Sequence, residues 1–180
     1  QVAASQPLKK QLWARMVAAK ITNQASLLRD SCAKRSLEKH ARAVRSGDPQ
    51  NVEAQAARLY WPLLFSGSHG DGSSEPFRRS DRAQWPNACL NYGYAVLRAI
   101  TARAICAAGL MPELGVHHHN RYDAFALASD LMEPFRPWVP RSGSRTFATR
   151  CWRTWTSPRP WSRTRSHSCP ICSVKTQHLS

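Results

Sequence analysis

The most strongly helical pattern of apolar residues in this chain spans residues 87–108, and it limits the folds that the chain can adopt. Apolar or small residues recur there every three to four positions, and only Arg98 and Arg103 carry charge. Such a broad apolar stripe is typical of a helix that is covered on most sides. The sequence therefore predicts a long helix near the centre of the domain, ended by Gly109.

Four other segments carry helix signals, over residues 7–29, 31–44, 49–60 and 122–133. Asp48 and Pro49 are a good N-cap and a good first helical residue for the third of these, and Pro134 should end the fourth. No segment alternates polar and apolar residues as a strand would, and the Gly-rich stretch 67–74 is typical of a loop. We therefore predict an all-α fold.

The charge is unevenly distributed along the chain. Residues 1–139 hold 18 basic and 11 acidic side chains, whereas residues 140–180 hold eight basic side chains and no acidic one. The second segment also lacks periodic apolar positions, so it cannot bury enough surface to offset the entropy of ordering it. We interpret residues 1–139 as a helical domain and residues 140–180 as an aberrant, disordered tail that resembles translation in a shifted reading frame.

The formal net charge of +15 indicates a polyanionic partner, with nucleic acid as the first candidate and an anionic membrane as the second. No run of about 18 uncharged apolar residues is present, and Lys9 and Lys10 interrupt the stretch where a signal peptide would need its apolar core. We therefore expect a cytoplasmic protein without membrane association.

Candidate metal ligands lie on two of the expected helices and on the connection between them. Glu53 has small or apolar neighbours, so it either favours the helix dipole in a first turn or needs a cationic partner. Asp130 and Glu133 are spaced i, i+3, which places both carboxylates on one helix face, where one cation can bridge them. One imidazole from the run 117–119 with these acids would favour Mg²⁺ or Mn²⁺.

A rival metal constellation, Cys169-Pro-Ile-Cys172, lies in the tail and lacks a second cysteine pair, so we do not predict a zinc site. No Gly-rich phosphate loop and no supported Ser-His-Asp arrangement is present.

Several motifs, in order along the chain, resemble a known family. They are Gln1-Val-Ala-Ala-Ser-Gln-Pro-Leu-Lys-Lys-Gln-Leu-Trp13, Lys20-Ile-Thr-Asn-Gln24, Gly47-Asp-Pro-Gln-Asn-Val-Glu-Ala54, Asn87-Ala-Cys-Leu-Asn-Tyr-Gly-Tyr-Ala-Val-Leu97, Gly109-Leu-Met-Pro-Glu-Leu-Gly-Val-His-His118 and Asp130-Leu-Met-Glu-Pro-Phe-Arg-Pro137. The chain resembles, up to about Val139, the CRISPR-associated integrase-endonuclease that inserts new spacers, in the version of type II systems. The resemblance implies a helical catalytic lobe that binds DNA and uses a divalent metal.

The resemblance also implies roles for single residues. Glu53, His118 and Asp130 match the metal ligands and catalytic residues, with His117 and His119 as weaker matches than His118, and Glu133 takes the position of a further acid near the metal. Phosphate contacts are expected from basic side chains: Arg15, Lys20, Arg58, Arg98 and Arg121. The implied reaction is attack of a DNA 3′-hydroxyl on a phosphodiester at the repeat boundary.

Partners are implied as well. They are DNA, as prespacer and CRISPR repeat, a small companion protein, and a second copy of the intact protein. Compared with the family, we expect the N-terminal β-rich domain that pairs protomers to be absent from this chain, and the sequence departs from the family after Pro137. We therefore expect a catalytic-lobe fragment with impaired activity. The alternatives are a DNA-binding fragment without catalysis and a non-functional product of a degraded gene.

Overall fold

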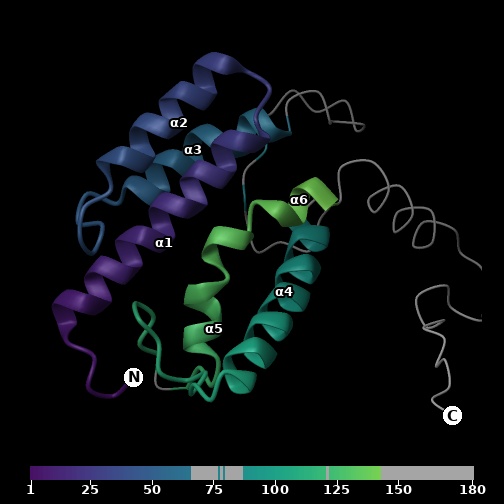
Figure 1. The fold of residues 1–180 in the computed structure, drawn as a ribbon. Coiled ribbons are helices and arrows are strands. Elements are labelled where there is room, and N and C mark those ends of the chain that lie inside the picture. Colours follow the sequence, from purple (N-terminus) through teal and green to yellow (C-terminus); the bar gives the residue numbers. More distant parts are fainter. Residues whose placement is uncertain (66–76, 78, 80–86, 121, 143–180) are drawn as a thin grey trace, which may run out of the picture.

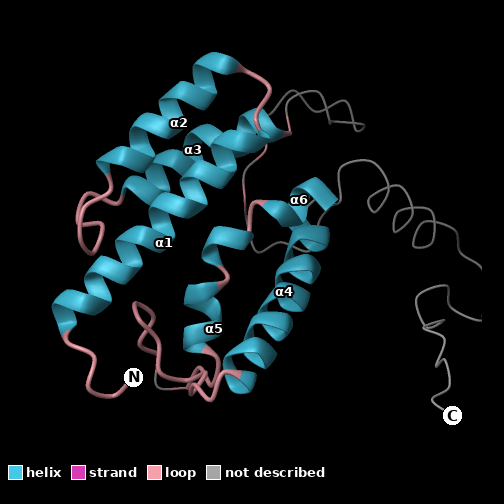
Figure 2. Cartoon of the chain, in the orientation of Figure 1, coloured by secondary structure: helices cyan, strands magenta, loops and turns pink. Residues whose placement is uncertain are grey.

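The structure is a computed structural model that describes residues 1–65, 77, 79, 87–120 and 122–142. These residues form helices and connecting loops without a strand, which confirms the all-α prediction for the described part of the chain (Figure 2). The elements are α1 (Gln6–Leu27), α2 (Ser31–Ala43), α3 (Val52–Leu64), α4 (Asn87–Ala107), α5 (Ala126–Leu131), the 3₁₀-helix η1 (Glu133–Phe135) and α6 (Trp138–Ser142).

Helix α1 occupies the centre of the fold. It runs between α2 and α3 on one side and α5 with η1 on the other, and α4 packs beyond α5 and α6 (Figure 1). Its buried residues are not all apolar, because Lys20 and Gln24 are buried together with Trp13, Val17 and Ile21. The core around α1 also takes Leu37 from α2 and Val52, Ala56 and Tyr60 from α3.

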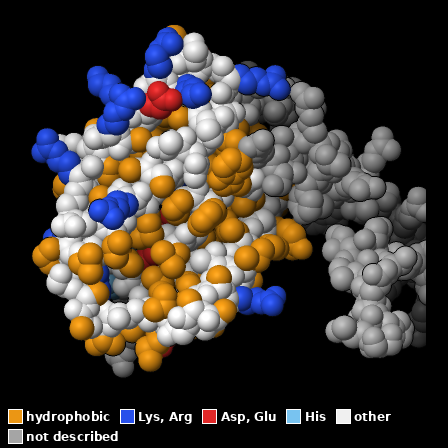
Figure 3. Space-filling view, in the orientation of Figure 1, with side chains coloured by type: hydrophobic (Ala, Val, Ile, Leu, Met, Phe, Trp, Pro, Cys, Tyr) orange, Lys and Arg blue, Asp and Glu red, His pale blue; other side chains and the backbone are white. Residues whose placement is uncertain are grey.

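The expectation that the helix over 87–108 lies at the centre was wrong. Within the part of the chain that the structure describes, helix α4 lies at the edge, where it buries Leu90, Tyr94 and Ile105 toward its neighbours. Tyr92 is 61% exposed, and Ile100 is 60% exposed. In the view of Figure 3, apolar side chains spread across the middle and the lower part of the visible face. An apolar stripe thus identified the helix correctly but not its position.

Helix α3 begins three residues later than predicted, and the cap is more elaborate. Asn51 is the N-cap, and its side chain accepts a hydrogen bond from the N–H of Ala54. Asp48 lies outside the helix at positive φ, and its two carboxylate oxygens accept from the N–H groups of Val52 and Glu53 at 2.9 and 3.0 Å. Both caps fix the first turn, and Glu53 is in that turn.

Helix α5 begins four residues later than predicted, and it ends at Leu131, after which the chain tightens into η1. Pro134 lies inside this 3₁₀ turn. Helix α6 crosses the expected domain boundary at 139, and Pro140 is buried. Residues 143–180, for which disorder and a shifted reading frame were predicted, lie outside the described residues, as does the expected loop at 67–74. Among the described helices, none is long and apolar enough to span a membrane.

Candidate functional site

Lys20 lies between two carboxylates that come from distant parts of the chain. Its ammonium Nζ is 2.5 Å from Oε1 of Glu53 and 2.5 Å from Oε2 of Glu133. The side chain of Lys20 is only 11% exposed, and that of Glu133 only 5%. Buried charges of this kind persist only when they are paired, so the contact joins α1, α3 and η1 at one point.

Glu133 has a second cationic partner. Its Oε1 is 3.1 Å from Nε of Arg136, one turn further along the chain. The guanidinium of Arg136 also lies over the ring of Tyr94, at 4.9 Å from the ring centroid. Burial raises the pKa of Tyr94 to about 12, so this ring stays neutral beside the charged pair. Glu133 is therefore held from two sides, by Lys20 and by Arg136.

Asp130 holds the loop that carries the three histidines. Its side chain is fully buried, and its Oδ2 accepts hydrogen bonds from the N–H groups of Val116 and His117 at 2.6 and 2.8 Å. Its Oδ1 accepts from the N–H of His118 at 3.3 Å and pairs with Nδ1 of the same residue. With Nδ1 bonded to the carboxylate, Nε2 is the ring nitrogen of His118 that remains for another partner.

The histidine loop is also shaped by close packing. A Cβ added to Gly115 would lie 2.2 Å from the backbone oxygen of His118, so only glycine fits there. Trp13 stacks on the ring of His117, with centroids 4.0 Å apart, and meets the ring of His118 edge-on at 5.8 Å. Helix α1 thus contacts both the histidine loop, through Trp13, and the carboxylate pair, through Lys20.

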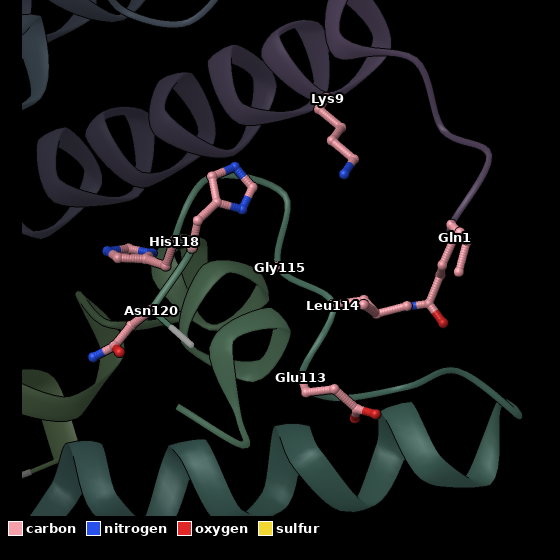
Figure 4. A pocket seen from close by; sticks show the side chains of 9 residues that line it. Gln1, Lys9, Glu113, Leu114, Gly115, His118 and Asn120 are labelled. Atoms are coloured by element: carbon pink, nitrogen blue, oxygen red, sulfur yellow. The ribbon is translucent and has the colours of Figure 1, made fainter. Parts of the chain in front are cut away.

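An open hollow of about 340 Å³ lies beside the histidine loop (Figure 4). Lys9 reaches into it from α1, and His118 and Asn120 line it from the loop. At its far end, the side-chain amide of Gln1 pairs with the backbone of Met111 in both directions, at 2.9 and 2.7 Å. The side chain of His118 is 49% exposed, so it can meet a ligand that enters this hollow.

The predicted ligands form two pairs. Glu53 and Glu133 share Lys20, and His118 bonds to Asp130. Asp130 and Glu133, expected to bridge one cation, bind different partners because the helix ends between them. Among the residues that the structure describes, no group of three or more His, Cys, Asp or Glu side chains is arranged to hold a metal ion. The cysteine pair at 169 and 172 lies outside this part of the chain.

The predicted phosphate contacts differ in their surroundings. Arg15 and Arg58 are exposed, as a phosphate contact requires. Lys20 is buried against carboxylates, so it does not face solvent. Arg98 has 40% of its side chain exposed and pairs with Asp123 at 2.5 Å. Arg121 lies outside the described residues.

Sequence reasoning missed the pairing role of Lys20 and the contacts of Arg136. One signal was present, because Lys20 falls in register with Trp13, Val17 and Gln24 on one stripe of the helix. A lysine on an otherwise buried stripe needs an acidic partner, and Glu53, with small or apolar neighbours, is an acid that needs a cation.

Comparisons with known proteins agree on one family. The profile described as "CRISPR associated protein Cas1" matches residues 1–150. A curated relative from Neisseria meningitidis, named CRISPR-associated endonuclease Cas1, is 47% identical over 141 residues, which cover 76% of this chain and 43% of the relative. A second, CRISPR-associated endonuclease Cas1 1 from Francisella tularensis subsp. novicida, is 31% identical over 148 residues, covering 69% of this chain and 44% of the relative.

The fold matches a chain of the solved structure described as a partial Cas6-RT-Cas1–Cas2 complex. The TM-score is 0.65 at 24% identity, and the match covers 77% of this chain and 45% of that chain. The chain therefore spans less than half the length of these relatives.

Proposed function

This chain belongs to the CRISPR-associated Cas1 family, and we propose that it supplies the helical lobe of a metal-dependent DNA endonuclease and integrase. The proposed reaction is the insertion of spacers into a CRISPR array, in which a DNA 3′-hydroxyl attacks a phosphodiester. The observation that carries the proposal is the convergence of Glu53 and Glu133 on one cation, the ammonium of Lys20.

The carboxylate pair fits a divalent ion. Each oxygen is 2.5 Å from the same nitrogen, and Mg²⁺ prefers carboxylate oxygens at about 2.0–2.1 Å. Glu53 and Glu133 would hold Mg²⁺ or Mn²⁺, and Nε2 of His118 is the nitrogen donor that the family resemblance implies. Among the described residues this ring is not grouped with the two carboxylates, so it would have to move toward them. In this assignment Asp130, which the sequence proposed as a ligand, acts on the ion through His118, because its carboxylate already accepts three backbone N–H groups. When bound, the cation would supply Lewis-acid stabilisation of the negative charge that develops at the phosphodiester.

The remaining roles fall to residues of the chain itself. Asp130 accepts the proton of Nδ1 and so orients the His118 ring toward its other nitrogen. Trp13 packs against the same loop and restricts its movement. Exposed Arg15 and Arg58 are suited to the DNA backbone, which would make binding depend more on DNA shape than on base sequence.

The partners proposed are prespacer and repeat DNA, a small companion protein and a second copy of the complete protein, in the cytoplasm. The name of the solved neighbour, a Cas1–Cas2 complex, supports the companion protein. Because the chain covers 43% of the Neisseria relative, we expect at most weak Mn²⁺-dependent cleavage from these 180 residues alone.

The test is cleavage of a branched DNA by the 180-residue chain in Mn²⁺, compared with its Glu53→Gln, Glu133→Gln and Glu38→Gln variants. Both site variants should abolish cleavage while DNA affinity, measured by fluorescence anisotropy, stays within about twofold, and the α2 control should cleave normally. Cleavage that persists in both site variants would refute the proposal.

One observation favours the alternative of a DNA-binding lobe without catalysis. No three candidate ligands are grouped among the described residues, and a lysine occupies the position between the two glutamates. If DNA binding is normal and Mn²⁺ does not bind, this alternative is the correct one.

A further inference from the structure

The ammonium of Lys20 lies between Glu53 and Glu133, where the proposed divalent ion would also bind. Its side chain is 11% exposed, and its nitrogen is equally close, at 2.5 Å, to one oxygen of each glutamate. Together with Arg136, which contacts the other oxygen of Glu133, the cluster holds two positive and two negative formal charges. The carboxylates are therefore already neutralised without any metal.

A divalent ion and this ammonium cannot share the two carboxylates. An ion placed between the two glutamates would take the position of the Lys20 ammonium, and like charges at such short range repel strongly. Arg136 does not compete in the same way, because it binds the opposite oxygen, Oε1, of Glu133. Of the two cationic side chains, Lys20 and Arg136, only Lys20 therefore competes with a divalent ion.

We infer that Lys20 is an internal competitor of the metal: its ammonium holds the Glu53–Glu133 pair in the metal-free lobe and is displaced when a divalent cation binds. This inference rests on the proposed metal site and adds a residue that sets its affinity. A lysine can take this role because its charge sits on a long flexible stem, so the ammonium can leave while the helix stays in place. Binding of the ion then costs the loss of the two ion pairs of Lys20.

The lobe should therefore bind a divalent cation more weakly than the two carboxylates would bind it without Lys20. Lys20 keeps the buried Glu133 and the partly exposed Glu53 paired when no metal is present, which preserves the contact between α1, α3 and η1. The metal is bound only when its concentration is high enough to displace the ammonium. Removing the lysine charge should therefore strengthen metal binding, which is the opposite of what removal of a supporting residue does.

The experiment is a Mn²⁺ titration of the full 180-residue chain, followed by the electron paramagnetic resonance signal of free Mn²⁺. Lys20→Met keeps much of the length and apolar stem of the side chain but removes its charge. The matched control is Lys39→Met, which removes the same charge from an exposed position on α2. We expect Lys20→Met to bind Mn²⁺ at least tenfold more tightly than the unmodified chain, and Lys39→Met to bind it unchanged. Equal or weaker binding by Lys20→Met overturns the inference.

A second measurement uses the unmodified chain, so it does not depend on the folding of a variant. Reductive methylation of lysines, quantified by mass spectrometry, reports how accessible each ammonium is. Saturating Mn²⁺ should raise the labelling rate of Lys20 several-fold and leave that of Lys39 unchanged. A Lys20 rate that stays the same or falls would show that the ammonium is not displaced.

The outcomes separate this inference from the proposed function. If Glu133→Gln weakens Mn²⁺ binding but Lys20→Met does not strengthen it, the metal site stands and the competitor role of Lys20 is wrong. If the tight binding of Lys20→Met is lost in the Lys20→Met, Glu133→Gln double variant, the ion and the ammonium share one site. If neither the unmodified chain nor Lys20→Met binds Mn²⁺, both the metal site and this inference fail.

Discussion

Replacement of Asp130 by asparagine tests how the histidine loop is held, because it removes a charge while it keeps the shape of the side chain. The carboxylate is fully buried and accepts from the backbone N–H groups of Val116, His117 and His118, as well as pairing with the His118 ring. Asparagine has one oxygen for these donors, and its amide NH₂ must face the others.

The expected cost follows from these contacts. Hydrogen bonds to a charged acceptor contribute about 1.5–3 kcal/mol each, roughly twice the value for a neutral acceptor. If the asparagine oxygen keeps the bonds from Val116 and His117 without their charge assistance, and the N–H of His118 loses its acceptor, the chain loses about 3–4 kcal/mol of its free energy of unfolding. The matched control is Asp123→Asn, whose partner Arg98 is 40% exposed, and we expect it to cost about 1 kcal/mol or less.

The assay is urea unfolding followed by far-ultraviolet circular dichroism at pH 7, with both variants measured beside the unmodified chain. A slope of about 1–3 kcal/mol per molar urea converts the loss at Asp130 into a midpoint shift of at least about 1 M. The asparagine NH₂ should also donate to Nδ1 of His118 and move the ring proton to Nε2, which ¹⁵N chemical shifts of the ring report. A loss below 1 kcal/mol with an unchanged tautomer would refute the account of the loop.

Three further perturbations have expected outcomes. Gly115→Ala should cost about 2–4 kcal/mol in urea unfolding, because its Cβ would meet backbone at 2.2 Å, whereas Gly109→Ala, with φ of +70° but open space, should cost about 1 kcal/mol. In DNA binding measured against salt, Arg15→Gln should reduce the slope of log affinity by up to about 0.9, and Arg98→Gln should change it little; the reverse order would contradict the assignment. Burial raises the pKa of Tyr94 to about 12, so between about pH 10 and 12 the folded chain keeps a proton that the unfolded chain releases. The stability that neutral Tyr94 contributes to the folded chain is therefore complete below about pH 10 and is lost as the pH rises from about 10 to 12. Tyr94→Phe should therefore flatten the alkaline loss of stability by up to about 3 kcal/mol, and an unchanged pH profile would show that Tyr94 is not the group responsible.

The sequence could predict which segments form helices, but it could not predict where each helix lies in the fold. The apolar stripe of residues 87–108 identified α4, yet α4 lies at the edge with Tyr92 and Ile100 exposed. Periodicity reports which face of a helix is apolar, and it does not say whether another element of the same chain covers that face. Helix α1 is central although Lys20 and Gln24 interrupt its buried stripe, and the burial of Lys20 is possible because it finds carboxylate partners in distant segments.

The candidate residues could be named from the sequence, but their pairing could not. The i, i+3 spacing of Asp130 and Glu133 assumed a continuous helix, and the chain instead changes to a 3₁₀ turn between them. Asp130 therefore bonds the histidine loop, and Glu133 bonds Lys20 and Arg136. Local spacing cannot reveal these contacts, because each joins segments far apart in the sequence and depends on how the helices pack.

The measurement that bears most directly on the central claim is the Mn²⁺ affinity of the unmodified chain beside Glu53→Gln, Glu133→Gln and Glu38→Gln. If the carboxylates of Glu53 and Glu133 are the ligands, the unmodified chain should bind one Mn²⁺, and each of the first two changes should weaken binding by at least tenfold. Glu38→Gln, on α2, should leave it unchanged. Mn²⁺ binding that is equally strong in all four proteins, or that is lost equally in the Glu38 variant, would contradict the assignment of the metal to this pair.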